Sequence, residues 1–178
     1  MLVQVVVLVA TLGSPGGPCP IVEQTGSGFA LRLPTTFQHC LLEAAPGFRP
    51  WSLADYSEDI RTGYRFSLRQ TPWAVTGDFN GDGWCDLVIE GHVATRSCRL
   101  VVWGGTKPTA SAIETSALSP GVPLSSALEF CRPGHIESNF SDDSMDLFTD
   151  GFSDNDWQEA AVLHFWRNGH FEDFQTDD

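Results

Sequence analysis

One nine-residue segment of this 178-residue chain carries oxygen-bearing side chains at a spacing that suits a hard cation. In the segment 78–86, such side chains occupy positions 1, 3, 5 and 9, and glycine occupies positions 4 and 6. Ca²⁺ takes about six to eight oxygen ligands at about 2.3–2.6 Å, and a backbone carbonyl at position 7 can supply one of them. The expected calcium ligands are Asp78, Asn80, Asp82, the carbonyl of Trp84, and Asp86, with water completing the shell.

The flanking residues distinguish this loop from an EF-hand. An EF-hand needs a bidentate Glu at position 12, and Ile89 stands there. The apolar and β-branched runs 73–76 and 87–89 predict strands on both sides of the loop, and residues 98–104 predict a third strand. Asp, Asn and Gly also favour ordinary polar turns. The register of four oxygen-bearing side chains, with Gly83 permitting the tight bend, favours a strand–calcium loop–strand unit.

These residues resemble a known repeat. The run 77–83, Asp86, the apolar run 87–89 and the later run 101–104 are similar to the FG-GAP (VCBS-type) repeat of integrin-like β-propellers and of many secreted bacterial proteins. Carried over position by position, the calcium ligands of that family fall on the five groups named above. The resemblance covers about residues 73–104. It implies calcium binding but no particular activity, because the family serves adhesion, scaffolding and enzyme-accessory roles.

The repeat occurs once. A β-propeller needs about four to eight blades. The nearest second match, residues 150–156, has Gly at position 2 and none at position 6, and is interpreted as a solvated acidic loop. The sequence therefore predicts a small domain that uses one such unit, and not a closed propeller.

Length and composition favour one globular domain without a nucleic-acid partner. Apolar residues make up 42% of the chain and charged residues only 19%, which is typical of a folded domain. The net charge is −13 at pH 7 and the pI is about 4.5. Such a chain offers no basic patch that would displace counterions from nucleic acid. Attraction to an anionic membrane surface is disfavoured for the same reason.

The N-terminus is interpreted as an export signal. Residues 2–12 are apolar over a length typical of a signal sequence and too short to span a bilayer. The turn-rich residues 13–18 follow, so cleavage is expected between about residues 12 and 20. No Lys or Arg precedes the apolar run, and a Val-rich strand is the alternative. The expected organisation is a signal segment and linker over 1–28 and a single α+β domain over 29–178.

Five cysteines fit an oxidising compartment. None forms a CxxC pair, and no His lies at zinc-ligand spacing from them. One or two disulfides are expected after export. Cys85 and Cys98 are poor partners because they lie near opposite ends of a predicted hairpin. Pairing of Cys40 with Cys131, or of Cys19 with Cys40, remains open, and so does a set of buried free thiols.

The remaining pattern predicts an α+β fold, with a mainly antiparallel sheet and two short N-terminal helices. The second helix is expected to begin at a capping box of Ser52 and Asp55. A C-terminal hairpin is expected to turn at Asn168-Gly169. The other expected elements are helices over 35–45 and 52–60, strands over 64–68, 127–131, 160–166 and 170–174, a mostly irregular stretch over 104–124 with a weak strand at 112–115, and an acidic loop over 141–156.

No catalytic motif is recognisable. The five histidines are scattered, and neither HExxH, GxSxG nor a Walker loop occurs. The sequence therefore favours a secreted or periplasmic, non-catalytic, calcium-binding module that acts as a binding or scaffold protein for a protein or carbohydrate ligand. The alternative is a small extracytoplasmic hydrolase with a structural calcium. A cleft with a His in hydrogen-bond reach of a carboxylate would favour the enzyme. An exposed apolar or aromatic patch without such a pair would favour the binding module.

Overall fold

A computed structural model describes most of the chain beyond the predicted signal segment. The described residues are 19–25, 28–119, 121–139, 141–156 and 160–177. The predicted apolar signal run over 2–12 and the turn-rich residues 13–18 therefore lie outside the described residues.

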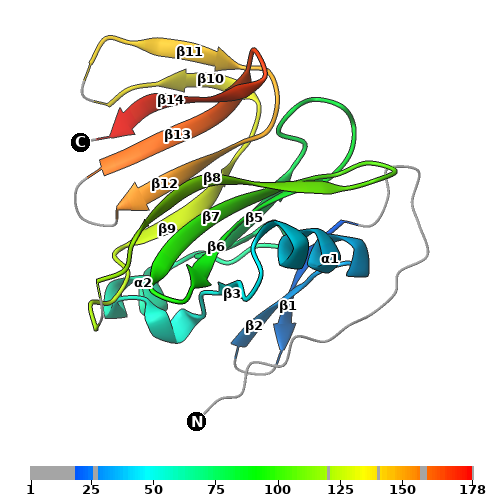
Figure 1. The fold of residues 1–178 in the computed structure, drawn as a ribbon. Coiled ribbons are helices and arrows are strands. Elements are labelled where there is room, and N and C mark those ends of the chain that lie inside the picture. Colours follow the sequence, from blue (N-terminus) through cyan, green and yellow to red (C-terminus); the bar gives the residue numbers. More distant parts are fainter. Residues whose placement is uncertain (1–18, 26–27, 120, 140, 157–159, 178) are drawn as a thin grey trace.

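Within these ranges the protein is mainly antiparallel β-sheet with two short α-helices, and it forms no closed barrel or propeller (Figure 1). The expected class of fold is confirmed at this level. The elements are β1 (Ile21–Thr25), β2 (Gly28–Arg32), α1 (Thr35–Ala44), β3 (Arg49–Pro50), a 3₁₀ turn (Leu53–Asp55), α2 (Glu58–Gly63), β4 (Gln70–Thr71), β5 (Ala74–Gly77), β6 (Asp86–Val93), β7 (Arg96–Trp103), β8 (Thr109–Ala117), β9 (Ser126–Cys131), β10 (Gly134–Glu137), β11 (Ser144–Leu147), β12 (Gly151–Asp156), β13 (Ala160–Arg167) and β14 (His170–Asp177).

A six-stranded antiparallel sheet forms the centre of the protein, in the order β4-β5-β6-β7-β8, with β3 pairing onto β6. Because side chains alternate between the faces of a strand, β6 and β7 carry two apolar faces. Leu87, Ile89 and Leu100 belong to the core on one face. Val88 and Val101 belong to a separate core on the other face. The central sheet is therefore covered on both sides.

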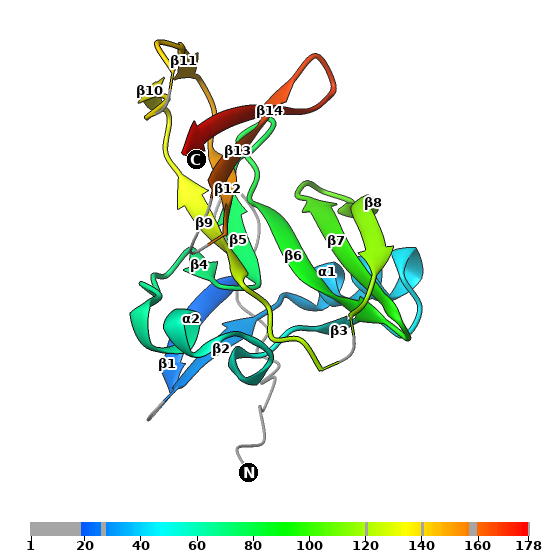
Figure 2. The same cartoon turned by 90° about the vertical axis from the view of Figure 1, so that its left-hand side faces the viewer.

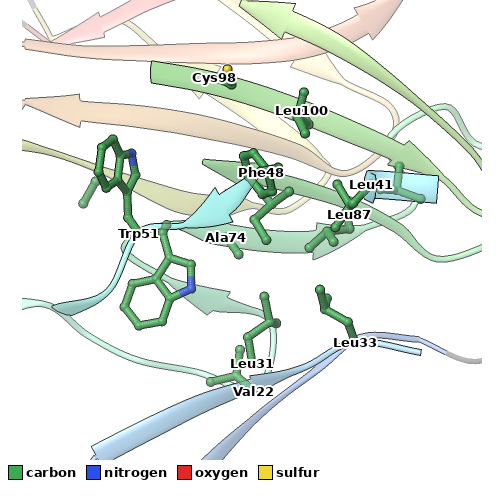
Figure 3. Packing of buried hydrophobic residues seen from close by; sticks show 14 of the residues in the cluster. Val22, Leu31, Leu33, Leu41, Phe48, Trp51, Ala74, Leu87, Cys98 and Leu100 are labelled. Carbon is green, nitrogen blue, oxygen red and sulfur yellow. The ribbon is translucent and has the colours of Figure 1, made fainter. Parts of the chain in front are cut away.

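The first face is covered by the helices and the β1–β2 hairpin. Figure 3 shows Val22 and Leu31 of that hairpin lying against the side of the sheet that carries Ala74 and Leu87. Phe37 and Leu41 of α1 and Ile60 of α2 are buried in the same cluster.

The second face is covered by a four-stranded sheet in the order β14-β13-β12-β9, which Figure 2 shows beside the central sheet. Leu128 and Phe152 of this sheet pack against Val88 and Val101. The two sheets also meet directly, because the Leu128 N–H donates to the Pro72 carbonyl at 2.9 Å. The β10–β11 hairpin packs on the far face of the four-stranded sheet through a third apolar cluster.

Several predicted elements are confirmed. Helix α1, the three strands around the loop, strand β9 and the final hairpin all form where the sequence predicts them. Asp55 accepts the Ser52 N–H at 2.7 Å, as a capping box requires, although the helical stretch is split into a 3₁₀ turn and α2. Asn168 and Gly169 have φ of 53° and 86°, which is the left-handed pair of a type I′ turn.

Four predictions are wrong. Residues 64–68 form no strand, because Tyr64 and Phe66 are instead held by tertiary contacts: Phe66 stacks on Phe29 with ring centroids 3.7 Å apart. The stretch 104–124 contains the nine-residue strand β8, whose Ser- and Thr-rich side chains are mostly exposed, so hydrophobic alternation is weak there. The acidic stretch contains β11 and β12. The expected linker contains β1, and its Val22 is buried.

Candidate functional site

The predicted calcium loop joins β5 to β6, whose paired residues Gly77 and Asp86 bracket it. The chain reverses direction through two residues with left-handed backbone conformation, Gly81 with φ of 76° and Gly83 with φ of 83°. Glycine adopts this region without the steric cost of a Cβ. The turn that the sequence predicts at Gly83 is therefore present.

Three of the five expected ligands converge on the backbone of this turn. Asp78 accepts the N–H groups of Asp82 at 3.0 Å and Gly83 at 2.9 Å. Asn80 Oδ1 accepts the same Asp82 N–H at 3.0 Å, and Asp82 Oδ1 accepts the Trp84 N–H at 2.8 Å. A carboxylate offers about four lone-pair sites, so these bonds leave acceptor capacity on the side chains that line the loop.

Asp86 occupies a different position. It is fully buried, and its two oxygens accept the N–H groups of Phe79 at 3.0 Å and Gly104 at 2.7 Å. Burial raises the pKa of Asp86 to about 6; the two N–H donors oppose this effect, and the charges of Asp82 and Asp78 add to it. Asp86 thus ties the start of the loop to the end of β7.

The donor chemistry of the loop fits a hard cation, but the conformation does not assemble a complete carboxylate cage. Over the described residues, no three side chains of His, Cys, Asp or Glu are arranged as a group that could hold a metal ion. Asp78, Asn80 and Asp82 lie together, Trp84 lies in the turn, and the Asp86 carboxylate is directed at backbone donors. The expected calcium ion and its ligand set therefore stay a prediction.

Two long-range contacts hold this loop, and neither is evident from the motif. The first is Asp150, which accepts the Asp78 N–H at 2.9 Å and pairs with Arg69 at 3.2 Å. The Asp150 N–H in turn donates to the Asp78 carbonyl at 3.2 Å. Asp150, at the start of the rejected second motif, therefore docks the loop onto the four-stranded sheet.

The second contact is a disulfide between Cys19 and Cys85, whose Cα atoms are 5.4 Å apart. The two cysteines are 66 positions apart in the sequence, and Cys85 lies within the loop. Cys40, Cys98 and Cys131 are free thiols, so the pairings considered from the sequence are wrong. Spacing alone could not identify the pair, because β1 and β2 bring the N-terminal segment to the sheet only in the folded chain.

A second group of polar side chains lies further along β6 and on its neighbouring strands. Glu90 on β6 is directly opposite Arg99 on β7, and Arg99 is opposite Glu114 on β8. Arg99 Nη2 contacts Glu90 at 2.6 Å, and Nη1 lies 3.4 Å from Glu114. Arg99 also pairs closely with Asp154 of β12. These residues link the two large sheets, and we refer to Glu90, Arg99, Glu114 and Asp154 as the charged cluster.

Burial makes this cluster electrostatically unusual. The Arg99 side chain is only 7% exposed and that of Glu90 13%. Burial raises the pKa of Glu90 to about 7; Arg99 opposes this shift, whereas the charges of Asp154 and Glu114 add to it. Burial lowers the pKa of Arg99, but the carboxylates of Glu90 and Asp154 outweigh it and the net shift is upward. Arg99 therefore remains a cation between carboxylates.

His164 of β13 borders the cluster. Its Nδ1 lies 2.6 Å from Asp173 Oδ1, and its Nε2 lies 3.4 Å from Arg99 Nη1. Because a guanidinium can only donate, this arrangement places the acceptor lone pair on Nε2 and the proton on Nδ1. Burial and the Arg99 charge lower the pKa of His164, although Asp173 opposes them. The neutral imidazole is thus a structural partner of Arg99.

A cavity of about 170 Å³ opens onto the charged cluster. It adjoins a cleft of about 750 Å³, and the two share Trp51, Ser97, Ser116, Leu124 and Ser126 in their walls. No sequence motif marks this site. The one available signal was that Glu90 and Arg99 each adjoin an apolar run, residues 87–89 in β6 and residues 100–102 in β7.

Comparisons with known proteins add no relatives. No protein-family model matches the chain, and neither a curated protein nor a solved structure matches it. The FG-GAP resemblance therefore rests on the residues of the loop and its flanking strands. Separately, none of the helices in the described ranges has the length and apolar character needed to cross a membrane.

Proposed function

We propose that this chain is a secreted or periplasmic, non-catalytic binding module in which the loop 78–86 holds one structural calcium ion. The observation that carries the proposal is the convergence of Asp78, Asn80 and Asp82 on the turn between β5 and β6. Oxygen donors of this kind are the ligands that Ca²⁺ prefers. Their spacing is that of the FG-GAP repeat.

A structural role follows from the place of the loop in the fold. Three separate parts of the chain meet there: the N-terminal segment through Cys19, the four-stranded sheet through Asp150, and the end of β7 through Gly104. A cation that fixes the loop would therefore fix the junction of these parts. Because metal binding to the folded state alone is linked to folding, calcium would raise the stability of the whole domain.

Calcium titration tests the proposal. The protein, refolded and freed of metal with EDTA, is titrated with CaCl₂ by calorimetry, and its melting temperature is measured with and without the ion. We expect one bound Ca²⁺ and a higher melting temperature. Asp82→Ala should remove both effects. Asp142→Asn, which removes one exposed acidic side chain outside the loop, is the matched control and should retain them.

Two results would contradict a structural calcium ion. One is an unchanged melting curve on chelation of protein that was verified to be calcium-loaded. The other is an equal loss of calcium stabilisation in Asp82→Ala and Asp142→Asn. That result would attribute the stabilisation to the net charge of the protein and not to the loop.

A hydrolase is the second candidate, because His164 lies 2.6 Å from Asp173 beside the charged cluster. The same geometry favours the binding role. The acceptor nitrogen of His164 faces Arg99, and Glu90 and Asp154 are both paired with that guanidinium. His164, Glu90 and Asp154 are each engaged by the Arg99 guanidinium, which disfavours the use of these three groups as a general base on a substrate. Turnover of chromogenic ester or glycoside substrates that Glu90→Gln abolishes would reverse this preference.

The proposed extracytoplasmic location has its own test. The Cys19–Cys85 disulfide is compatible with an oxidising compartment. Intact-mass analysis of protein from the native host should show a chain that begins between residues 12 and 19 and contains one disulfide. A chain that begins at Met1 and carries five reduced thiols would contradict export.

A further inference from the structure

The charged cluster has an excess of negative charge. Three carboxylates, those of Glu90, Glu114 and Asp154, line the 170 Å³ cavity together with one guanidinium, that of Arg99. The cluster is therefore short of positive charge by two when all four groups are ionised. Arg99 is already contacted by all three acids, so it has little capacity left for an anionic ligand.

One carboxylate oxygen in this cluster lacks a donor. Asp154 Oδ2 pairs with Arg99, whereas Asp154 Oδ1 is buried and has no hydrogen-bond partner among the described residues. Buried polar atoms are nearly always hydrogen-bonded, and a buried carboxylate oxygen needs a donor most of all. Glu114, in contrast, is 62% exposed and lies at the rim of the cluster. Asp154 Oδ1 is itself closed to solvent, so the part of the cluster that is open to a ligand is the excess negative charge at Glu114.

The adjoining cleft has the shape and surface for the rest of such a ligand. Its volume of about 750 Å³ lies within the range of about 300–1,000 Å³ that is usual for ligand sites. Ala54, Ala94 and Leu124 give it apolar walls, and Trp51 lines both the cleft and the cavity. Apolar walls bind an aliphatic stem, and an indole face attracts a cation.

We propose that the cavity binds an ammonium or guanidinium group carried on an aliphatic stem, with the stem lying in the adjoining cleft. This inference rests on the proposed binding function and specifies its ligand class. The charged head would lie beside the exposed Glu114, and the carboxylates of Glu90 and Asp154 would add to the negative charge around it. The same chemistry is carried by free alkyl amines and guanidines and by Lys or Arg side chains of a polypeptide.

Calorimetric titration of the calcium-loaded protein tests the inference. The probes are agmatine, butylamine and the peptide acetyl-Gly-Lys-Gly-amide, with butyrate as the anionic control. We expect saturable binding of the cations, none of butyrate, and weaker binding at high salt. Tighter binding of agmatine or butylamine would indicate a small-molecule source of the head group, and tighter binding of the peptide a polypeptide source.

Two variants identify the site. Glu114→Gln removes one exposed carboxylate and should weaken cation binding about tenfold, because a charge-assisted contact is lost. Ser116→Trp, on the exposed edge strand β8, adds bulk to a wall shared by cavity and cleft without changing any charge, and should abolish binding. Asp142→Asn is the charge-matched control outside the site, and it should bind as the unaltered protein does.

The inference is overturned if none of the cations binds, if butyrate binds equally well, or if Glu114→Gln and Asp142→Asn weaken binding alike. The melting temperature with and without calcium, measured on the same samples, separates the two proposals. Retained calcium stabilisation without cation binding overturns the ligand assignment alone. Cation binding without calcium stabilisation overturns only the calcium role.

Discussion

The calcium loop and the charged cluster both involve strand β6, yet they are built in opposite ways. The loop satisfies its carboxylates with neighbouring backbone N–H groups, which lie two to five positions away along the chain. In the cluster, Arg99 is paired with side chains from more distant positions of the chain: Glu90 is 9 positions away and Asp154 is 55 positions away. Local chemistry of the first kind is recognisable in a sequence, whereas the second kind exists only after the sheets have packed.

The two regions should also differ in how they contribute to stability. The charges of the loop are partly exposed and close together, so they repel one another without a cation. Arg99 and Glu90 of the cluster are buried and paired, so removal of one leaves the other without compensation. Four predictions test this contrast.

The largest effect is expected for Arg99→Met. The substitution leaves Glu90 and Asp154 buried without their cation. Breaking a buried ion pair in this way typically costs about 3–5 kcal/mol. We expect urea unfolding to show a loss of this size, with the calcium-dependent increment in stability unchanged.

Arg96→Met is the matched control for that prediction. Arg96 lies on the same strand, is exposed, and donates to the Thr115 hydroxyl at 2.8 Å. Its loss should stay within about 0.5 kcal/mol, as is usual for surface substitutions. Equal costs for the two variants would show that the Arg99 network is not a distinct stabilising unit.

The second effect is that of calcium on the loop. At a calcium concentration 100 times the dissociation constant, binding to the folded state alone adds about 2.7 kcal/mol. Asp78→Ala and Asp82→Ala should lose this increment. Asp154→Asn should lower the stability measured in EDTA but keep the increment, because it disturbs the charged cluster and not the loop.

Melting temperatures with CaCl₂, with MgCl₂ and with EDTA provide the measurement. Mg²⁺ should substitute poorly, because it demands a smaller octahedral shell. If Asp154→Asn removes as much calcium stabilisation as Asp82→Ala, the two regions are not separate and the acidic residues 150–156 contribute to the metal site.

The contrast also explains how much could be predicted from the sequence. The strands beside the loop, helix α1 and the final hairpin follow from periodicity and turn residues, which act over a few positions. Only a weak strand over 112–115 is predicted within β8, because its exposed Ser and Thr side chains carry no apolar period, and the pairing with β7 defines the full strand. The roles of Asp150 and Asp154 were missed because each depends on a partner more than 50 positions away.

The third effect is a change of stability with pH that depends on Glu90. Its folded pKa of about 7 lies above the ordinary value of 4.5. The folded protein therefore holds this proton more firmly than the unfolded chain does. The contribution of Glu90 to stability is complete below about pH 4.5 and is lost as the pH rises through about 7.

Comparison with Glu90→Gln isolates that contribution, because glutamine has a similar shape and does not titrate. The difference in unfolding free energy between the unaltered protein and the variant should fall by roughly 1–2 kcal/mol from pH 5.0 to pH 7.5. Arg99, Asp154, Glu114 and His164 face the same region and are present in both proteins, so their own titration largely cancels. A difference that does not depend on pH would place Glu90 in a solvated environment.

The smallest effect is the change in calcium affinity when the disulfide between the N-terminal segment and the loop is removed. The Cys19–Cys85 disulfide closes a long loop of chain, and its removal should lower global stability by about 2–5 kcal/mol, as for native disulfides in small secreted domains. Its effect on calcium affinity should be much smaller, because the ligands in the turn are oriented by the backbone bonds of Asp78, Asn80 and Asp82. We expect the Cys19→Ser/Cys85→Ser variant, titrated below its melting temperature, to bind calcium less than tenfold more weakly, a change below about 1.4 kcal/mol. A larger loss of affinity would mean that the calcium loop depends on a distant segment as strongly as the charged cluster does, and the distinction between a locally built and a remotely built site would fail.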